Sequence, residues 1–222
     1  MLFLFVLLLV VMLVLWKQGI FDSILQQLFS DSKTASIQMP SKPGKPLIKS
    51  KPKDLPKILL NENKGLNELL EKNFNKNNVK LHISKSLYKL TLIYDTKKIK
   101  EYPIVLGGDP VNDKLRKGDK RTPEGNFKIK NLYPHRAWSK FIWLNYPTSD
   151  SWKKYSLAKA EGKISESDKI GGQIGIHGVP DGGDRLIDHH INWTLGCISL
   201  KIKDINEIFS VVQAGTPIKI SH

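Results

Sequence analysis

The sequence predicts a mostly β fold with a few short helices, preceded by an apolar N-terminal segment and a flexible tether. Three observations support this prediction. The first 16 residues are all apolar, and a stretch rich in lysine and proline follows them. From Val79 onward, short runs that favour β-strands alternate with clusters of Gly, Pro, Asn and Asp. The 222 residues, of which 40% are hydrophobic, suffice for one domain of common size plus an appendage.

The chain opens with "MLFLFVLLLVVMLVLW", and its first charged residue is Lys17. A membrane-spanning helix needs about 20 apolar residues, and Gly19, Ile20 and Phe21 could extend the run. A cleaved signal peptide would show a basic start and a small-residue cleavage site, and neither is evident. We therefore expect residues 1–21 to be an uncleaved membrane anchor, with a cleaved signal as the alternative. Either places the domain outside the cytoplasm, in the periplasm or on the outer face of the cytoplasmic membrane.

Residues 22–57 predict a tether. Between Lys33 and Lys57 there are seven lysines and one acid, so this segment alone supplies +6 of the formal charge of +14. Such a segment buries too little apolar surface to fold and suits loose attraction to an anionic envelope surface. With only four arginines, the chain lacks the Arg-rich, aromatic-interleaved surface of nucleic-acid binders, so nucleic acid is not an expected partner.

Residues 58–78 are expected to form a short helical lead-in, because leucines and a phenylalanine recur at helical spacing between Asn61 and Phe74. Residues 79–222 are expected to form the main domain. Its expected strands are 79–83, 87–95, 99–108, 126–130, 141–145, 173–178 and 216–220. Its expected helices are 152–161 and 203–212.

Cys197 is the only cysteine in the chain. A single thiol in an oxidising compartment can pair with another chain, can be buried and inert, or can be a reactive group. The number of cysteines alone favours the buried, inert thiol. Its neighbours favour reactivity. Gly196 precedes it, so the backbone N–H groups of Gly196 and Cys197 could turn toward one point and hold an oxyanion.

A strand ends in His177, twenty residues before Cys197. Such a histidine is often structural, but it could also project into a cleft and act as a base. An ion pair with it would lower the thiol pKa by about two units from its usual value near 8.5, making roughly three quarters of the thiol ionised. We therefore expect a thiolate–imidazolium pair.

In spacing, the sequence resembles the L,D-transpeptidase (YkuD-type) family. His177, sixteen further residues and then "TLGC" match that family's histidine, spacer, Ser or Thr, any residue and Gly-Cys. The resemblance extends upstream through "YPIVLGGDP" and "GDKRTPEGNFKI" and downstream through "DINEIFSVVQAGTPIKI", covering roughly residues 80–220. Three blocks in the same order are far more specific than a single Gly-Cys pair.

The resemblance implies a β-sandwich-like catalytic domain that acts on peptidoglycan stem peptides and needs no cofactor. Cys197 would be the nucleophile and His177 the general base, oriented by the Gly178 carbonyl, while Gly196 and Cys197 supply the oxyanion hole. Thr194, Ser199 and Trp193 are expected to contact the substrate. The chain departs from many members at Leu195, where they carry a second histidine, and at Ser199, where they carry Arg or Asn.

Two other functions stay open. Because of these departures, a hydrolase on the same site, an L,D-carboxypeptidase or amidase, is kept as the alternative, and a third hypothesis is a non-catalytic module that binds the cell wall. Other classes fit poorly, because a papain-like protease would place Cys before His, and the S-x-x-K matches, such as those at Ser30, Ser50 and Ser86, lack their partner motifs. The segment Asp181–His190 is expected to be a mobile loop and is a candidate substrate lid. It lacks the spacing of a zinc motif, so no metal is expected.

Overall fold

A computed structural model describes residues 58–222, so the predicted anchor and the whole predicted tether lie outside the described residues. The elements are α3 (Leu66–Leu69), η1 (Lys76–Asn78), β1 (Val79–Ser84), β2 (Lys89–Tyr94), β3 (Lys97–Pro103), β4 (Gly125–His135), β5 (Ser139–Leu144), α4 (Ser149–Ala160), β6 (Gly175–Gly178), α5 (Arg185–Asp188), β7 (Ile198–Leu200), α6 (Ile202–Val211) and β8 (Pro217–Ser221). Within this part of the chain, no helix has the length and apolar character needed to cross a membrane.

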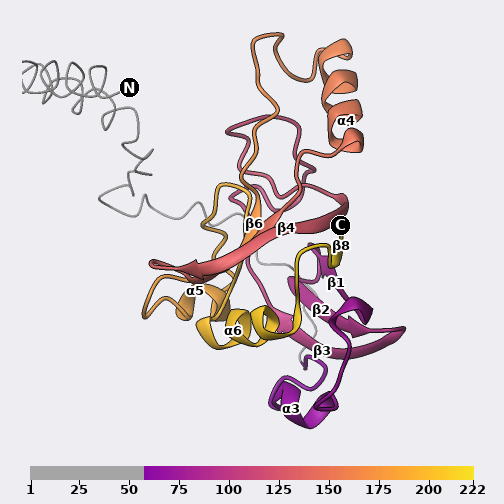
Figure 1. The fold of residues 1–222 in the computed structure, drawn as a ribbon. Helices are drawn as coiled ribbons and strands as arrows, with labels where there is room; N and C mark the ends of the chain where they lie inside the picture. The colour runs from indigo at the N-terminus through magenta and orange to yellow at the C-terminus, as the bar shows by residue number, and fades with distance from the viewer. Residues whose placement is uncertain (1–57) are drawn as a thin grey trace, which may run out of the picture. The chain divides into compact units, whose positions relative to one another are not determined.

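The eight strands form one sheet in the order β3-β2-β1-β8-β4-β5-β6-β7 (Figure 1). The long strand β4 pairs with β8 through its first residues and with β5 through the rest, so it belongs to both halves of the sheet. Backbone hydrogen bonds join Val105, which follows β3, to Ser199 in β7. These bonds link the two ends of the strand order and nearly close the sheet. The predicted mostly β fold is thus confirmed.

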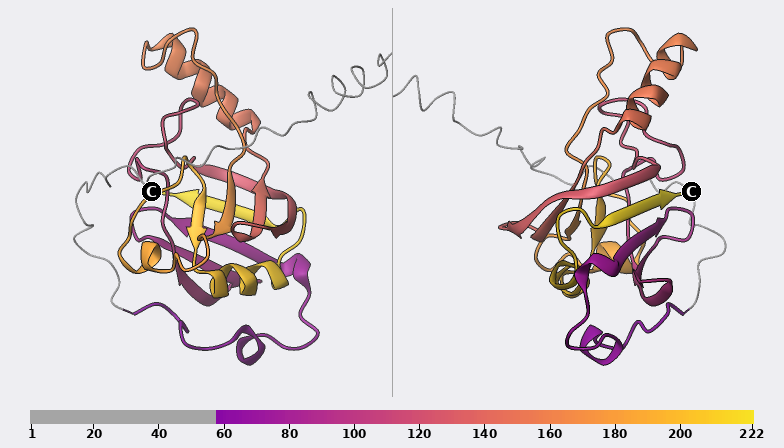
Figure 2. Two further views of the ribbon diagram at one scale, coloured as in Figure 1. Left: turned by 90° about the vertical axis from the view of Figure 1, so that its left-hand side faces the viewer. Right: turned by 45° about the vertical axis from the view of Figure 1, so that its right-hand side comes forward.

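The two halves of the sheet face each other across one hydrophobic core. Because side chains alternate along a strand, each strand sends one set inward and the other outward. The half formed by β3, β2, β1, β8 and the start of β4 contributes residues such as Leu81, Leu92 and Ile218 to the core. The half formed by β5, β6 and β7 contributes Ile142 and Ile176, among others. Each half therefore has its own outer face, on opposite sides of the core (Figure 2).

Helix α6 closes one side of this core, and its sequence explains why. Ile205, Ile208 and Val211 recur at helical spacing and are all buried in the core. The helices expected at 152–161 and 203–212 are confirmed with ends shifted by a few residues. The expected lead-in helix is wrong in length, because only Leu66–Leu69 is α-helical and the chain becomes extended at Leu70.

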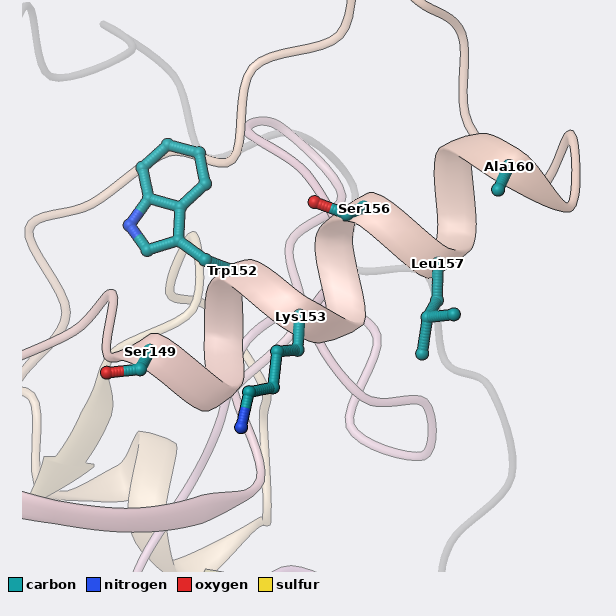
Figure 3. Close-up of a pocket in the computed structure, with 6 residues that line it drawn as sticks. All are labelled: Ser149, Trp152, Lys153, Ser156, Leu157 and Ala160. Atoms are coloured by element: carbon teal, nitrogen blue, oxygen red, sulfur yellow. The ribbon is translucent and has the colours of Figure 1, made fainter.

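Helix α4 belongs to the connection between β5 and β6 and stands away from the sheet (Figure 1). Thr148 caps it by accepting a hydrogen bond from the Ser151 N–H at 3.3 Å. Trp152 and Leu157 are exposed on it and line a shallow hollow along the helix (Figure 3). Lys154 Nζ bonds the Glu124 carbonyl at 2.9 Å and the Asp113 carboxylate, which ties the helix back to the loop before β4.

Candidate active site

The pairing of β6 with β7 brings the predicted base and nucleophile to one face of the sheet. These strands are parallel, with Ile176 opposite Ile198 and His177 opposite Ser199. Cys197 lies directly before β7, two residues from Ser199, so the backbone directs residues 197 and 199 to the side that also carries His177. Ile176, Ile198 and Leu200 point the other way, into the core. The candidate site therefore lies on the outer face of the β5-β6-β7 half.

The orientation of the His177 ring is set by its neighbour in the chain. Its Nδ1 lies 2.8 Å from the Gly178 carbonyl oxygen. Because a carbonyl can only accept, Nδ1 carries the hydrogen and Nε2 of the neutral ring keeps a free electron pair. This is the contact that the resemblance implied for Gly178. Gly178 itself must be glycine, since a Cβ there would lie 2.6 Å from the Trp138 carbonyl oxygen.

Aromatic rings surround His177, whose exposed fraction is only 2%. The Trp138 ring stacks on it at 4.3 Å between centroids, Phe141 lies nearly parallel at 5.8 Å, and Trp193 meets it edge-on at 5.5 Å. Burial lowers the pKa of His177 to about 4, against the effect of the Gly178 hydrogen bond. The imidazole is therefore neutral at neutral pH.

The Cys197 thiol is held in its neutral form as well. Burial raises its pKa to about 11, while a hydrogen bond from the Gly175 backbone and the charge of Lys114 act in the opposite direction. Cys197 is partly exposed as a residue, and the burial refers to the crowded surroundings of its sulfur. Its Sγ lies 3.5 Å from the Gln173 carbonyl oxygen, to which the S–H donates.

These protonation states correct the expected ion pair. Within the described residues, Sγ bonds the Gln173 carbonyl and makes no hydrogen bond to His177. The sequence indicated only that a histidine was available to ionise the thiol. It did not show the aromatic rings and backbone that remove water from both groups, which makes each charged form more costly than the neutral one.

The turn before Cys197 corrects part of the expected oxyanion hole. Gly196 has φ +138°, and a Cβ there would lie 2.7 Å from the Arg121 carbonyl oxygen, so the position requires glycine. However, its N–H donates to Thr194 Oγ1 at 3.2 Å, and that hydroxyl donates to the Cys197 carbonyl at 2.6 Å. The Gly196 N–H is therefore already satisfied, which leaves the N–H of Cys197 as the remaining candidate donor of the predicted pair.

Of the three predicted substrate contacts, two are buried. Thr194 spans the turn as described, with 5% of its surface exposed, and Ser199 is fully buried, with no partner for its Oγ among residues 58–222. Both side chains are covered in this structure, as that of His177 is, and their contact with substrate stays a prediction. Trp193 does lie against His177, with part of its surface exposed. Leu195, where many members have histidine, is 71% exposed.

The sequence analysis missed Trp138, Phe141, Gly175 and Gln173 as parts of this site. Trp138 and Phe141 come from the β4–β5 hairpin, where antiparallel pairing places Phe141 opposite His177. A Cβ on Gly175 would lie 2.4 Å from the Phe141 ring, so that glycine admits the aromatic packing. The strand "FIWLN" next to the histidine strand was the available signal, but the pairing of those two strands could not be read from the sequence.

The loops beside the site are well packed. Asp119, in the "GDKRTPEG" segment, accepts the N–H groups of Leu115, Arg116 and Arg121 at 2.8 to 3.0 Å, as a structural turn requires. The expected open loop at 181–190 instead contains α5, whose Ile187 is fully buried. Ile187 anchors this segment, whose other residues are exposed or partly exposed, and its mobility stays a prediction. Residues 58–222 contain no group of three or more His, Cys, Asp or Glu placed to hold a metal.

Comparisons with known proteins identify the family of this domain. The model of the L,D-transpeptidase catalytic domain (YkuD) family matches residues 78–220. Similar solved structures include the helical cell shape determining protein Pgp2 from Campylobacter jejuni, at 22% identity and TM-score 0.50 over 71% of this chain and 54% of that one. An L,D-transpeptidase from Mycobacterium smegmatis matches at 14% identity and TM-score 0.44, over 65% of this chain and 59% of that one.

Bdellovibrio bacteriovorus Bd1075 is also similar, at 19% identity and TM-score 0.47 over 65% of this chain and 48% of that one. The chain thus spans about half the length of Bd1075 and of Pgp2. None of the curated proteins matches the chain. The family match covers well over half of the chain and includes both His177 and Cys197, and the chain therefore belongs to the L,D-transpeptidase catalytic domain family.

Proposed function

We propose that the chain is an extracytoplasmic peptidoglycan L,D-transpeptidase with Cys197 as nucleophile and His177 as general base. The observation that supports this most strongly is the parallel register of β6 and β7, which puts both residues on one outer face. The Gly178 contact adds that Nε2 is the ring atom free to accept a proton. Membership of the family supports peptidoglycan as the substrate.

In the proposed first step, Sγ attacks a stem-peptide carbonyl that adjoins a D-amino acid, and its proton passes to His177 Nε2. The C–N bond then breaks as the imidazolium returns that proton to the leaving amine, which releases the D-amino acid and leaves a thioester on Cys197. In the second step an acceptor amine attacks the thioester and gives its proton to His177. The C–S bond breaks and the sulfur takes the proton back, which restores the thiol.

The neutral resting pair fits this order of events. Both groups keep the protonation state that the first step needs, a thiol proton and a free Nε2, across the neutral pH range. The thiol hydrogen bond to Gln173 must be exchanged for one to His177, so the mechanism requires the Cys197 side chain to rotate. The aromatic faces of Trp138 and Phe141 would then stabilise the imidazolium while it holds the proton.

A hydrolase on the same site is the second candidate, and one observation favours it. Of the two positions where the chain departs from many members, Leu195 presents an apolar side chain to solvent and Ser199 is buried. Neither offers an exposed polar group to hold an acceptor amine, so water could resolve the thioester instead. The acceptor therefore distinguishes the two proposals.

The test uses isolated muropeptides with and without excess acceptor amine, followed by mass spectrometry of the products and of the protein. Cys197→Ala and Cys197→Ser should abolish turnover and the acyl adduct on the protein while leaving its melting curve unchanged. Ser86→Ala, on the exposed β1–β2 turn, is the matched control and should behave as the natural protein.

Cross-linked or amine-exchanged products that depend on Cys197 would support the transpeptidase. Trimmed stems with no amine incorporation, even at high amine concentration, would overturn it in favour of the hydrolase. Turnover that survives Cys197→Ala would overturn the mechanism, and binding to sacculi without any product would favour a wall-binding module.

A further inference from the structure

The outer face of the other half of the sheet is basic. It belongs to β3, β2, β1, β8 and the start of β4, and it lies across the core from the face with His177 and Cys197. Lys80 lies opposite Ile93, which lies opposite Lys98. Lys219 lies between His82 on β1 and Asn126 on β4. We call Lys80, Lys98, Lys128 and Lys219 the back-face lysines.

All four back-face lysines are exposed, and within residues 58–222 none of them makes a salt bridge. By contrast, the buried Lys85, Lys100 and Lys114 each pair with a carboxylate at 2.7 Å. The carboxylate on the outward side of this half, Glu101, is buried and is neutralised by Lys89 at 2.7 Å. The face thus carries a net positive charge that the fold itself does not compensate.

The pKa of His82 reflects the positive charge of this face. It sits among these lysines, with Nε2 3.0 Å from Ser221 Oγ. Its pKa is lowered by burial and also by the charges of Lys219, Lys98 and Lys89, which disfavour a further cation on the same face. An anion placed against the face would relieve this repulsion.

The shape of the face favours a broad partner over a single small anion. A shallow groove runs across it, lined by residues such as Lys80, His82, Lys128 and Lys219. The lysines are spread over four strands, and neighbouring strands lie about 4.8 Å apart, so their charges form a broad array. Such an array matches a plane of phosphate headgroups, to which each lysine contributes independently.

The position of the face also favours a membrane as its partner. The described chain enters the domain along β3, where the Leu60 carbonyl accepts the Glu101 N–H at 3.0 Å. The lysine-rich segment 33–57 and the apolar run 1–16 precede this point in the sequence. A domain resting on a bilayer through its back face would present the outer face with His177 and Cys197 away from the lipid.

We propose that the back-face lysines dock the domain onto an anionic phospholipid bilayer and orient the face with Cys197 away from it. The test is amine footprinting of the whole protein mixed with vesicles of phosphatidylcholine, with or without phosphatidylglycerol. Acetylation of Lys80, Lys98, Lys128 and Lys219 should slow with phosphatidylglycerol present. High salt should remove the protection, because it screens charges at the surface. Lys153 and Lys163, exposed in α4 and after it, should stay reactive throughout.

A pair of matched variants tests the charge dependence. Lys80→Gln with Lys219→Gln should lower the docked-to-free ratio, read from Lys98 and Lys128, about 30-fold, because each lysine near an anionic surface strengthens binding about fivefold. Lys153→Gln with Lys163→Gln removes the same net charge and should leave the ratio unchanged. Equal acetylation on both vesicles, or equal protection of the α4 lysines, overturns the proposal. Protection by sacculi but not by phosphatidylglycerol overturns it too, with the wall polymer as the partner.

Discussion

Trp138 lies flat against His177, with 4.3 Å between ring centroids and 24° between ring planes. The other side of the indole stacks on His135 at 4.4 Å, so Trp138 is held between two imidazoles. Its carbonyl also accepts the N–H of Gly178 at 3.1 Å, and Gly178 is the residue whose own carbonyl binds His177 Nδ1. Trp138 therefore fixes both the plane of the imidazole and the backbone that orients it, and it excludes water from the ring.

Replacing Trp138 with Leu should lower kcat about tenfold with little change in KM, because a misplaced base weakens the transition state more than substrate binding. The pKa of His177 should also rise from about 4 toward its ordinary value of 6.5, since burial lowers it. The acid limb of the kcat/KM profile, which reports the free enzyme, measures this shift. Trp152→Leu, on exposed α4, is the control. A raised KM at unchanged kcat would instead make Trp138 a substrate contact.

The pKa values of the two reactive groups predict that the Cys197 thiol is alkylated slowly at neutral pH and faster as the pH rises. Because the pKa of Cys197 is raised to about 11, alkylation by iodoacetamide should speed up about tenfold per pH unit between pH 7 and 10 without reaching a plateau. His177→Ala should change the rate at pH 7 only slightly, since no ion pair is lost. A plateau near pH 7 that disappears in His177→Ala would show that a thiolate–imidazolium pair exists after all.

The periodic parts of the fold were predictable from the sequence. Ile205 and Ile208 mark the buried side of α6, and the alternation in "VKLHI" marks the inward residues of β1. Strand β4 was harder, since it was expected only over 126–130 but continues to His135 through "NLYPH". That part is bent and lies at the outer end of a hairpin, where residues are only partly buried and the period of two is lost.

The site was predictable in identity but less so in electrostatics. Spacing and chain order indicated Cys197 and His177, whereas the protonation states depend on neighbours distant in sequence such as Trp138. The burial of Thr194 and Ser199 was not predicted, for a related reason. A position near the nucleophile in sequence does not say which face the side chain takes or what covers it, and both residues are buried.

Thr194 should stabilise the turn of residues 194–197, which carries Cys197. Its hydroxyl accepts from the Gly196 N–H and donates to the Cys197 carbonyl, and Val replaces it with nearly the same shape but no polar atom. Thr194→Val should lower the free energy of unfolding by about 1–3 kcal/mol, because polar backbone groups in the turn lose their partner. Turnover should fall as well, since Cys197 is attached to that turn. Thr194→Ser keeps the hydroxyl and should retain most of both; a loss in Thr194→Ser with none in Thr194→Val would assign the effect to the methyl group. Urea unfolding and steady-state kinetics measure the two effects.

Asp204, in the first turn of α6, should destabilise the fold at neutral pH. Burial raises its pKa to about 6, against the effect of Lys203 and Lys100 and with a further contribution from Glu207. Below pH 3.8 the carboxyl is neutral in both the folded and unfolded states. As the pH rises from about 4 to 6, the unfolded chain releases this proton while the folded chain retains it, so stability falls. Above pH 6 the folded protein carries the full cost of a buried carboxylate.

Asp204→Asn keeps this position neutral at every pH. It should leave the free energy of unfolding nearly unchanged at pH 4 and raise it by up to about 3 kcal/mol at pH 7. His177, whose pKa is lowered, has the opposite pH dependence, because the unfolded chain binds its proton first as the pH falls below 6.5. That contribution is common to both proteins and cancels in their difference. Urea titrations at several pH values measure the difference, with the exposed Asp150→Asn as the matched control. A difference that stays constant with pH would show that Asp204 is ionised in the fold at no cost.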